Sequence, residues 1–282
     1  MTLGIIAIIC AVASVILCAA TGTFEGLSWL WALPAGFAAC FAAVLVLIFL
    51  VVWAMCQRVD LEKPQEKDSP VYREMAYFII RLILPVLQVR LHVKGLENVP
   101  TDRRVLLVSN HLNDMDPVIL LHCFRKNQIA FISKRENSTM FIVGKLMHKI
   151  MCQLINRKND REALKTILKC IQLLKDDEVS IGVFPEGYTS LDGLLHPFRH
   201  GVFKIAQKAQ DPIVVCTLRN TQYIFKNALR LKPTDVYLNV LEVIPPEELK
   251  GITAVQVGNR VHKRMADDLG PELVLQQKEE TP

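Results

Sequence analysis

The segment RVLLVSNHLNDMDPVIL, residues 104–120, decides the fold, because in it an apolar run gives way abruptly to polar side chains. A run such as RVLLVSN is typical of a strand that is covered on both faces. Asp116 precedes Pro117, and Asp before Pro is a common way to begin a helix, with Asp as N-cap and Pro at the first helical position. The segment therefore predicts a buried strand, a polar loop that contains His111, and a helix.

The patterns on both sides of this segment alternate between strand and helix. Segments with a period of two, or with short unbroken apolar runs, are expected to be strands, and segments with apolar residues at helical spacing are expected to be helices. The expected strands are 89–93, 104–110, 129–133, 179–184, 212–218 and 235–244. The expected helices are 117–123, 140–154, 159–177 with Asn159 or Asp160 as N-cap, and 254–269. This alternation predicts an α/β fold with a mainly parallel sheet flanked by helices.

The first 57 residues have a different composition from the rest of the chain. Their only charged side chain is Glu25, whereas all 33 Lys and Arg residues and the other 27 acidic residues follow, so the remainder has a formal charge of +6. Two apolar runs, Leu3–Ala20 and Leu27–Cys56, flank the short sequence TGTFEG. At about 1.5 Å per residue, the first run barely spans a hydrocarbon core of about 30 Å, and the second spans it with some tilt. We therefore predict an N-terminal transmembrane helical hairpin.

The first apolar run is also similar to a signal peptide, because it is short and ends in small residues. It lacks a basic region, however, and a second apolar run follows at once, so a retained membrane span is favoured. The first cationic residues, Arg58, Lys63 and Lys67, come directly after the second run. By the positive-inside rule this end lies in the cytoplasm, which predicts an integral membrane protein with its globular domain on the cytoplasmic face.

A polar, proline-flanked segment, DLEKPQEKDSP, separates the anchor from the globular part. The segment after it, VYREMAYFIIRLILPVL at 71–87, has apolar residues at helical spacing, interrupted by Arg73, Glu74 and Arg81. Two interpretations remain open: a helix that lies on the lipid headgroups, or a core helix of the domain. The expected divisions of the chain are a membrane anchor at 1–57, a linker at 58–70, a cytoplasmic domain at 71–275 and a disordered tail at 276–282.

Four of the eight cysteines lie in the apolar runs. The other four, Cys123, Cys152, Cys170 and Cys216, form no CxxC pair and have no His partner at metal-ligand spacing. We interpret them as buried thiols in a reducing compartment. The sequence indicates neither a metal site nor a cofactor.

Two of the expected strands end in polar loops: RVLLVS runs into NHLNDMD, and VSIGVF runs into PEGYTS. Ligands of open α/β sheets bind beyond the carboxyl ends of strands, so the two loops can face one pocket. His111 can take a proton from a hydroxyl that attacks an acyl carbon, and Asp116 can fix the tautomer of His111 and stabilise the imidazolium. The alternative is a strand-end His followed by an N-cap Asp, with Pro-Glu-Gly serving only as a turn.

NHLNDMD resembles the N-H-x4-D box of the glycerolipid acyltransferases, the family of lysophosphatidic acid acyltransferase. VFPEGYTS resembles that family's F-P-E-G-T-R-S box, in the expected order and at a plausible distance. LINR (154–157) and PIVV (212–215) are similar to the family's two other boxes, and VKGLENVP, SKRE and FRHGVFKIA are also family-like. The resemblance covers about 89–244 and implies a fold similar to that of glycerol-3-phosphate acyltransferase. A lone H-x4-D is a weak signal, but this ordered set is specific.

The resemblance implies transfer of a fatty acyl group from acyl-CoA or acyl carrier protein to the free hydroxyl of lysophosphatidic acid or a related lysophospholipid. It implies that His111 is the general base, that Asp116 orients it, and that no cofactor takes part. It also implies that Glu186 and Gly187 shape the acceptor site, and that Arg157 holds the acceptor's phosphate through bidentate hydrogen bonds.

One position departs from the family pattern. Where the third box usually has Thr-Arg, this chain has Tyr188-Thr189, so the arginine expected to meet the acceptor's phosphate is missing. The acceptor is then either a different lysophospholipid or alcohol, or its phosphate is bound by another cation. The candidates for that cation are Arg157, Lys134, Arg199 and His200.

Two rival functions follow from the same residues. A lipid hydrolase is disfavoured because no G-x-S-x-G elbow is present. A lipid-binding family member without activity is disfavoured by His111 and Asp116, whereas Thr189 leaves room for it.

The basic segment 219–233, with Tyr223 and Phe225, is also typical of single-strand nucleic-acid binders, but a membrane-tied chain of modest charge argues against nucleic acid. The expected partners are the phospholipid membrane, the lysophospholipid acceptor and the acyl donor.

Overall fold

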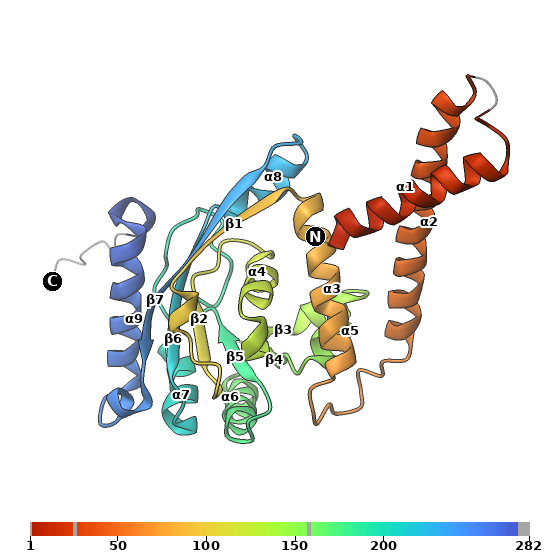
Figure 1. Cartoon of the computed structure of the whole chain (residues 1–282). Helices are drawn as coiled ribbons and strands as arrows, with labels where there is room; N and C mark the ends of the chain where they lie inside the picture. The colour runs from red at the N-terminus through yellow and green to blue at the C-terminus, as the bar shows by residue number, and fades with distance from the viewer. Residues whose placement is uncertain (1, 25–26, 157–158, 276–282) are drawn as a thin grey trace.

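The computed structural model describes residues 2–24, 27–156 and 159–275, and its globular part is built on one mixed sheet (Figure 1). The strands are β1 (Val89–Lys94), β2 (Leu106–Ser109), β3 (Ile129–Lys134), β4 (Gln153–Ile155), β5 (Ser180–Val183), β6 (Ile213–Arg219) and β7 (Thr234–Ile244). The helices are α1 (Thr2–Ala20), α2 (Trp29–Gln57), α3 (Pro70–Val86), α4 (Asp116–Cys123), α5 (Val143–Lys149), α6 (Asp160–Lys175), α7 (Lys204–Ala209), α8 (Ile224–Ala228) and α9 (Ala254–Leu269).

The sheet has the order β1-β7-β6-β2-β5-β3-β4. The strands from β6 to β4 are parallel, whereas β7 is antiparallel to β6 and parallel to β1. The predicted α/β class with a mainly parallel sheet is therefore confirmed. Because β2 and β5 are direct neighbours with Val108 opposite Val183, the two polar loops that follow them begin side by side.

The prediction of a helix over 140–154 is wrong. Helix α5 ends at Lys149, and the short strand β4 begins at Gln153. Met151 between them has a positive φ of 67°, a left-handed conformation that a right-handed helix cannot contain. The chain therefore turns at this point and adds a strand at the edge of the sheet.

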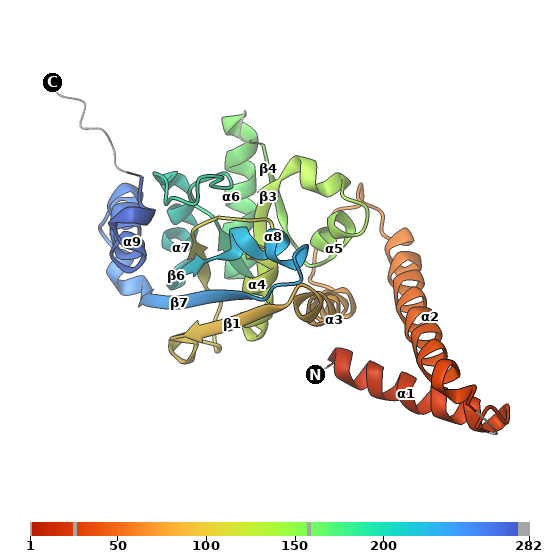
Figure 2. The ribbon, with the colours of Figure 1, turned by 90° about the horizontal axis from the view of Figure 1, so that it is seen from above.

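Helices cover both faces of the sheet (Figure 2). Leu106 and Val108 of β2 join the apolar core beneath α6, α7 and α9, whereas Leu107 belongs to the core beneath α3 and α4. All three side chains are fully buried. The unbroken apolar run of β2 thus follows from burial on both faces, as expected of a central parallel strand.

The two predicted apolar spans are helices α1 and α2, each long and apolar enough to cross a membrane. They pack through small residues: the Ser14 hydroxyl donates to the carbonyl of Leu33 over 2.9 Å, and a Cβ on Gly36 would lie 2.7 Å from Ser14 Oγ. Small residues at such a crossing let two helix backbones approach closely, as is common inside membranes. The length and composition of these helices suggest membrane association, while the orientation of the domain stays a prediction.

Helix α3 packs through apolar side chains on two of its sides. Ile80 and Leu84 pack into the core of the sheet, while Met75 and Ile79 pack with Val52 of α2. The core-helix interpretation is therefore correct for one side of α3. The other side holds the second apolar helix against the domain.

Arg73, which in the sequence interrupts the apolar pattern of α3, is among the buried residues of the domain at 2% exposure. Its guanidinium donates to both carboxylate oxygens of Asp68, over 2.6 and 2.8 Å. It also donates to the carbonyls of Ile129 and Ile150, over 3.0 and 3.1 Å. Because every one of these acceptors lies in a different segment, Arg73 fixes the end of the linker to the sheet.

Candidate active site

The first polar loop brings His111 and Asp116 together. The Nδ1 atom of His111 lies 2.9 Å from Oδ2 of Asp116, and the Asp116 side chain is fully buried. The same Oδ2 accepts the backbone N–H groups of Leu112 over 2.6 Å and of Asn113 over 2.8 Å. A carboxylate only accepts hydrogen bonds, so Nδ1 carries the proton and the lone pair of the neutral ring is on Nε2.

The predicted N-cap role of Asp116 is wrong. Helix α4 begins at Asp116 itself, its N-cap is Met115, and no side chain caps it. The carboxylate turns back over the loop because two backbone donors and the imidazole lie there. Asp116 therefore organises the loop that precedes the helix.

The second polar loop is attached to the first by Glu186. Its Oε1 accepts the backbone N–H of His111 over 2.8 Å. Its Oε2 accepts the Ser190 hydroxyl over 2.7 Å and the backbone N–H of His196 over 2.9 Å. Burial raises the pKa of the Glu186 carboxyl, and these three hydrogen bonds oppose the shift. At 1% exposure, Glu186 can shape an acceptor site only by holding its walls in place.

Thr189 lies at the Nε2 end of the imidazole. Its hydroxyl oxygen is 3.1 Å from Nε2 of His111, and since Nε2 has the lone pair, the hydroxyl is the donor. Phe184 stacks on the imidazole with ring centroids 4.2 Å apart. The ring of His111 is thus fixed on three sides, by Asp116, Phe184 and Thr189.

Of the remaining predicted site residues, the structure describes Gly187, Arg199 and Lys134. Gly187 has a φ of +85°, and a Cβ on it would meet the side chain of Arg199 at 2.9 Å, so glycine is needed here for both backbone and space. Lys134 is exposed at the carboxyl end of β3. Arg157 lies outside the described residues, and so does the tail 276–282. The structure therefore places Arg199, but not Lys134, in direct contact with the second loop.

An apolar cavity of about 180 Å³ opens beside the imidazole. Phe184, which stacks on His111, forms part of its wall, and Arg199, Gly187 and Asp160 also line it. Its apolar lining comes from Ile132, Ile155, Ala163, Ile167, Val183 and Val202. The sequence does not reveal this cavity, because its walls come from segments far apart in the chain.

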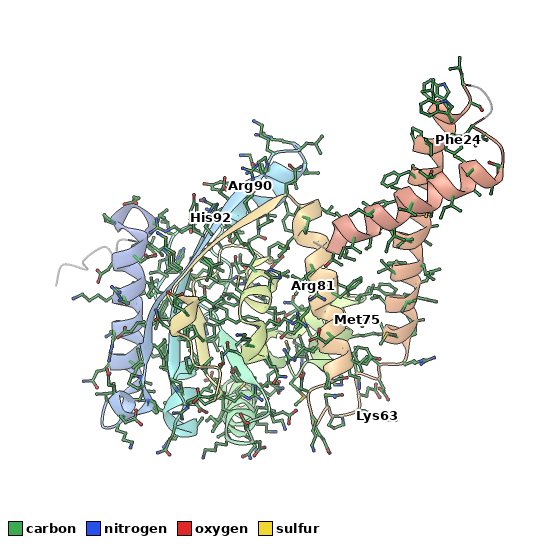
Figure 3. The ribbon with its side chains drawn as sticks, in the orientation of Figure 1. Phe24, Lys63, Met75, Arg81, Arg90 and His92 are labelled. Atoms are coloured by element: carbon green, nitrogen blue, oxygen red, sulfur yellow. The ribbon has the colours of Figure 1, made fainter. Side chains whose placement is uncertain are left out.

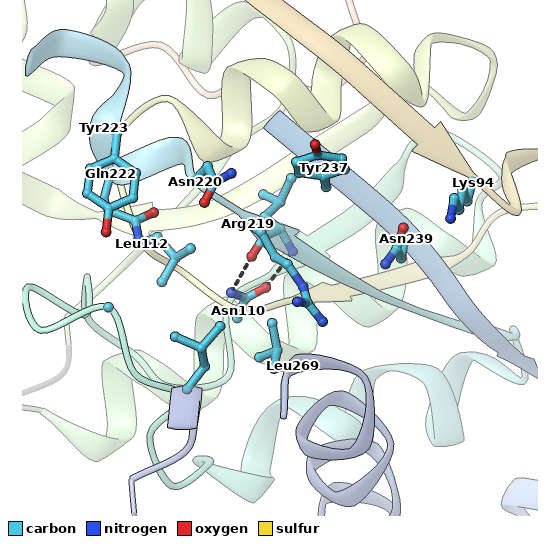
Figure 4. A pocket seen from close by; sticks show the side chains of 13 residues that line it. Lys94, Asn110, Leu112, Arg219, Asn220, Gln222, Tyr223, Tyr237, Asn239 and Leu269 are labelled. Atoms are coloured by element: carbon cyan, nitrogen blue, oxygen red, sulfur yellow. Dashed lines mark hydrogen bonds between the residues drawn. The ribbon is translucent and has the colours of Figure 1, made fainter. Parts of the chain in front are cut away.

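A larger, polar cavity of about 460 Å³ borders the first loop through Asn110 and Leu112, the neighbours of His111 (Figure 4). Asn110 forms two hydrogen bonds with the backbone of Leu218 and thereby ties the loop to β6. Lys94 supplies positive charge, and Arg219 also lines the cavity, with its guanidinium 3.5 Å from the carboxylate of Asp268. Sequence reasoning missed Arg219, since it reaches this place only through the pairing of β6 with β2.

The thiols of the domain are poor candidates for a nucleophile. All eight cysteines are free, and burial raises the pKa of Cys123 to about 12 and that of Cys152 to about 11. Such thiols stay protonated and unreactive at neutral pH. In the described parts of the chain no group of three or more His, Cys, Asp or Glu side chains is placed to hold a metal ion.

Comparisons with known proteins agree with this geometry. Residues 90–219 match the family model described as Acyltransferase. A 1-acyl-sn-glycerol-3-phosphate acyltransferase of Chlamydomonas reinhardtii is 33% identical over 183 residues, which are 64% of this chain and 53% of that protein. A probable 1-acyl-sn-glycerol-3-phosphate acyltransferase of Mycoplasma pneumoniae is 29% identical over 196 residues, 68% of this chain and 73% of that protein. The match thus spans about half of the algal relative.

The crystal structure of the 1-acyl-sn-glycerophosphate acyltransferase PlsC from Thermotoga maritima has the same fold. The TM-score is 0.60 at 22% identity, over 73% of this chain and 81% of that chain. The sheet, the two paired loops and the family match define an acyltransferase domain. Residues 90–219 thus belong to the family described as Acyltransferase, and the chain is similar to proteins named 1-acyl-sn-glycerol-3-phosphate acyltransferase. The predicted family and enzyme class are therefore confirmed.

Proposed function

We propose that the protein is a membrane-bound enzyme that moves a fatty acyl group from an acyl thioester to the free hydroxyl of lysophosphatidic acid or a related lysophospholipid. One observation supports this most directly. The lone pair of His111 faces a hydroxyl group, that of Thr189, at 3.1 Å, within the distance that general base catalysis requires. An acceptor hydroxyl in the same position has the same access to Nε2.

The proposed reaction needs only the groups at this site. Nε2 of His111 takes the proton of the acceptor hydroxyl while the hydroxyl oxygen attacks the thioester carbon. Asp116, 2.9 Å from Nδ1, stabilises the imidazolium that forms. When the carbon–sulfur bond breaks, the imidazolium returns the proton to the sulfur, and the products are an ester and a free thiol. The donor is acyl-CoA or acyl carrier protein, and no cofactor is consumed.

One cavity is apolar and the other is polar, and the substrates likewise have an apolar acyl chain and charged groups. An acyl chain is apolar and fits the cavity beside Phe184, whose lining includes Ile132 and Ile167. Anionic groups of the substrates fit cations that line the cavities, Arg199 in the apolar cavity and Lys94 in the polar one. Lys134 and Arg157 remain further candidates for the acceptor's phosphate.

A panel of lysolipids offered with labelled acyl donor tests this proposal. The full-length protein in detergent is expected to acylate at least one lysophospholipid, and His111→Ala is expected to lower kcat by about 10²–10⁴, the range that a general base contributes. His122→Ala, in helix α4 and away from both loops, is the matched control and should leave turnover unchanged.

Each other outcome favours a rival function. Release of free fatty acid without a new ester bond indicates a hydrolase. Lipid binding without turnover, unaffected by His111→Ala, indicates a lipid-binding protein.

A further inference from the structure

The segment around helix α8 exposes large apolar side chains to the surroundings of the protein. Leu229 is 88% exposed, Leu231 is 81% exposed and Phe225 is 47% exposed. Lys226, Arg230 and Lys232 alternate with them, and the segment 219–233 contains no acidic residue. Exposed apolar groups of this kind mark a surface that contacts another apolar body.

The backbone of this segment presents these side chains outward. The N–H groups of Leu231 and Lys232 donate to the carbonyls of Ala228 and Asn227, over 3.0 and 2.9 Å, which closes a tight turn. Leu231 in this turn has a positive φ of 53°, a conformation that is unfavourable for a residue with a Cβ. An exposed leucine in such a conformation gains little from the fold itself, so a contact outside the chain is expected.

The carboxyl end of helix α3 lies next to this turn. The backbone N–H of Thr234 donates to the carbonyl of Gln88 over 3.1 Å, which joins the end of the α8 segment to the residues just after α3. Val86, at 63% exposure, and Ile83, at 39%, continue the apolar surface. Figures 1 and 2 both show α8 beside this end of α3, and Arg90, labelled in Figure 3, is exposed close to it.

We call this surface the α8 face. It consists of apolar side chains surrounded by cations. Its members are Ile83, Val86, Arg90, Phe225, Lys226, Leu229, Arg230, Leu231 and Lys232.

The α8 face lies on the side of the domain toward which the free part of α2 extends (Figure 1). Helix α2 has 29 residues, about 43 Å, whereas a hydrocarbon core of about 30 Å needs about 20 residues. Its surplus lies at the carboxyl end, where Val52 and Cys56 pack against Met75 and Ile79 of α3. The two helices run in opposite directions (Figure 1), so the exposed end of α3 points toward the part of α2 that is free of the domain.

We propose that the α8 face rests on an anionic phospholipid bilayer, with Leu229 and Leu231 in the apolar boundary and the surrounding cations on the headgroups. The α8 face is separate from the hairpin of α1 and α2. The proposal depends on the proposed function, in which that hairpin is inserted in the membrane. The positive charge complements anionic lipid, and the face lies on the side of the domain toward which the free part of α2 extends.

The contact has a consequence for the active site. Tyr223, directly before α8, lines the polar cavity beside the loop of His111. A bilayer against the α8 face brings this cavity to the membrane surface, where a lysophospholipid is dissolved.

Fluorescence quenching tests the proposal without requiring any turnover. Full-length Leu231→Trp and Val255→Trp variants are reconstituted into vesicles of phosphatidylcholine and phosphatidylglycerol, with or without bromine on the acyl chains. Val255 is 50% exposed on α9, away from the α8 face, and both variants keep the three native tryptophans. Brominated lipid is expected to quench more than half of the emission that Leu231→Trp adds, and little of the emission that Val255→Trp adds.

Equal quenching of the two added tryptophans, or quenching of neither, overturns the proposal, and the latter result leaves the face to a protein or nucleic-acid partner. A second variant, Leu229→Asp with Leu231→Asp, keeps the test independent of the tryptophan. It should acylate lysolipid in anionic vesicles several-fold more slowly than the unchanged chain, and lysolipid in detergent micelles at the same rate. Equal loss in both media also contradicts the proposal. If no lysolipid is acylated at all, the proposed function fails, while the quenching result still stands.

Discussion

The two polar loops meet at His111, but they are held in different ways. In the first loop, Asp116 bonds partners three to five residues away in the chain. In the second loop, Glu186 bonds His111 across 75 residues, and Thr189 reaches the same imidazole across 78. The first loop therefore carries its chemistry within one short sequence. The second works only after the sheet has brought β2 and β5 together.

The largest effect is expected from the carboxylate of the first loop. In Asp116→Asn the side-chain amide can donate to Nδ1, which shifts the lone pair of the imidazole away from Nε2. We expect kcat for the preferred lysophospholipid to fall by about 10²–10⁴, as for loss of the base itself. Asp114→Asn, an exposed aspartate of the same loop, is the matched control. Equal rates for the two variants would show that the buried carboxylate does not set the tautomer.

The next effect concerns Glu186, the clamp whose carboxylate joins the second loop to the first through the backbone N–H of His111. Glu186→Gln replaces one acceptor oxygen by an amide that must face a backbone N–H, that of His111 or His196. A buried donor left without a partner costs about 1–3 kcal/mol, so the unfolding temperature should fall by about 2–4 °C for each kcal/mol lost. Circular dichroism of the full-length protein in detergent measures the change, with Glu97→Gln, an exposed residue, as control. An unchanged unfolding temperature would mean that the two loops hold together without the clamp.

The fold could be predicted from the sequence where local patterns decide it. The unbroken run of β2 and the amphipathic pattern of α6 depend only on which faces are buried, and both elements were found within a few residues of the expected bounds. The segment 140–154 was mispredicted because its apolar spacing suits a helix throughout. The left-handed turn at Met151 has no signature in a non-glycine residue.

The site, like the fold, could be predicted from the sequence only where its contacts are local in the chain. The pair of His111 and Asp116 lies within one motif, so its contact could be expected from the sequence. The contact between Thr189 and Nε2, the clamp by Glu186, and the approach of Arg219 to the first loop all depend on strand pairing. No one-dimensional pattern contains that pairing, so the sequence could mark Thr189 only as a departure from the family.

A smaller effect is expected when the missing arginine is restored. Thr189→Arg places a guanidinium beside the acceptor position, and a hydrogen bond to a charged group contributes about 1.5–3 kcal/mol. We expect kcat/KM for lysophosphatidate to rise by about tenfold relative to that for monoacylglycerol, which has no phosphate. Tyr188→Arg, in which the cation is one position away on an exposed residue, should not produce this ratio. If turnover of lysophosphatidate stays the same or falls, position 189 does not select the acceptor by charge.

The smallest effect is expected from removing only the hydroxyl of Thr189. Nε2 has a single lone pair, so the hydroxyl at 3.1 Å must move away before an acceptor hydroxyl can donate to the same atom. A neutral hydrogen bond contributes about 0.5–1.5 kcal/mol net, so Thr189→Val should raise kcat/KM for the acceptor by about two- to tenfold. Thr189→Ser keeps the hydroxyl and should behave as the unchanged chain. A loss of turnover in Thr189→Val, restored in Thr189→Ser, would instead make this hydroxyl part of the catalytic machinery, and the departure at position 189 would then be a gain of chemistry in the second loop.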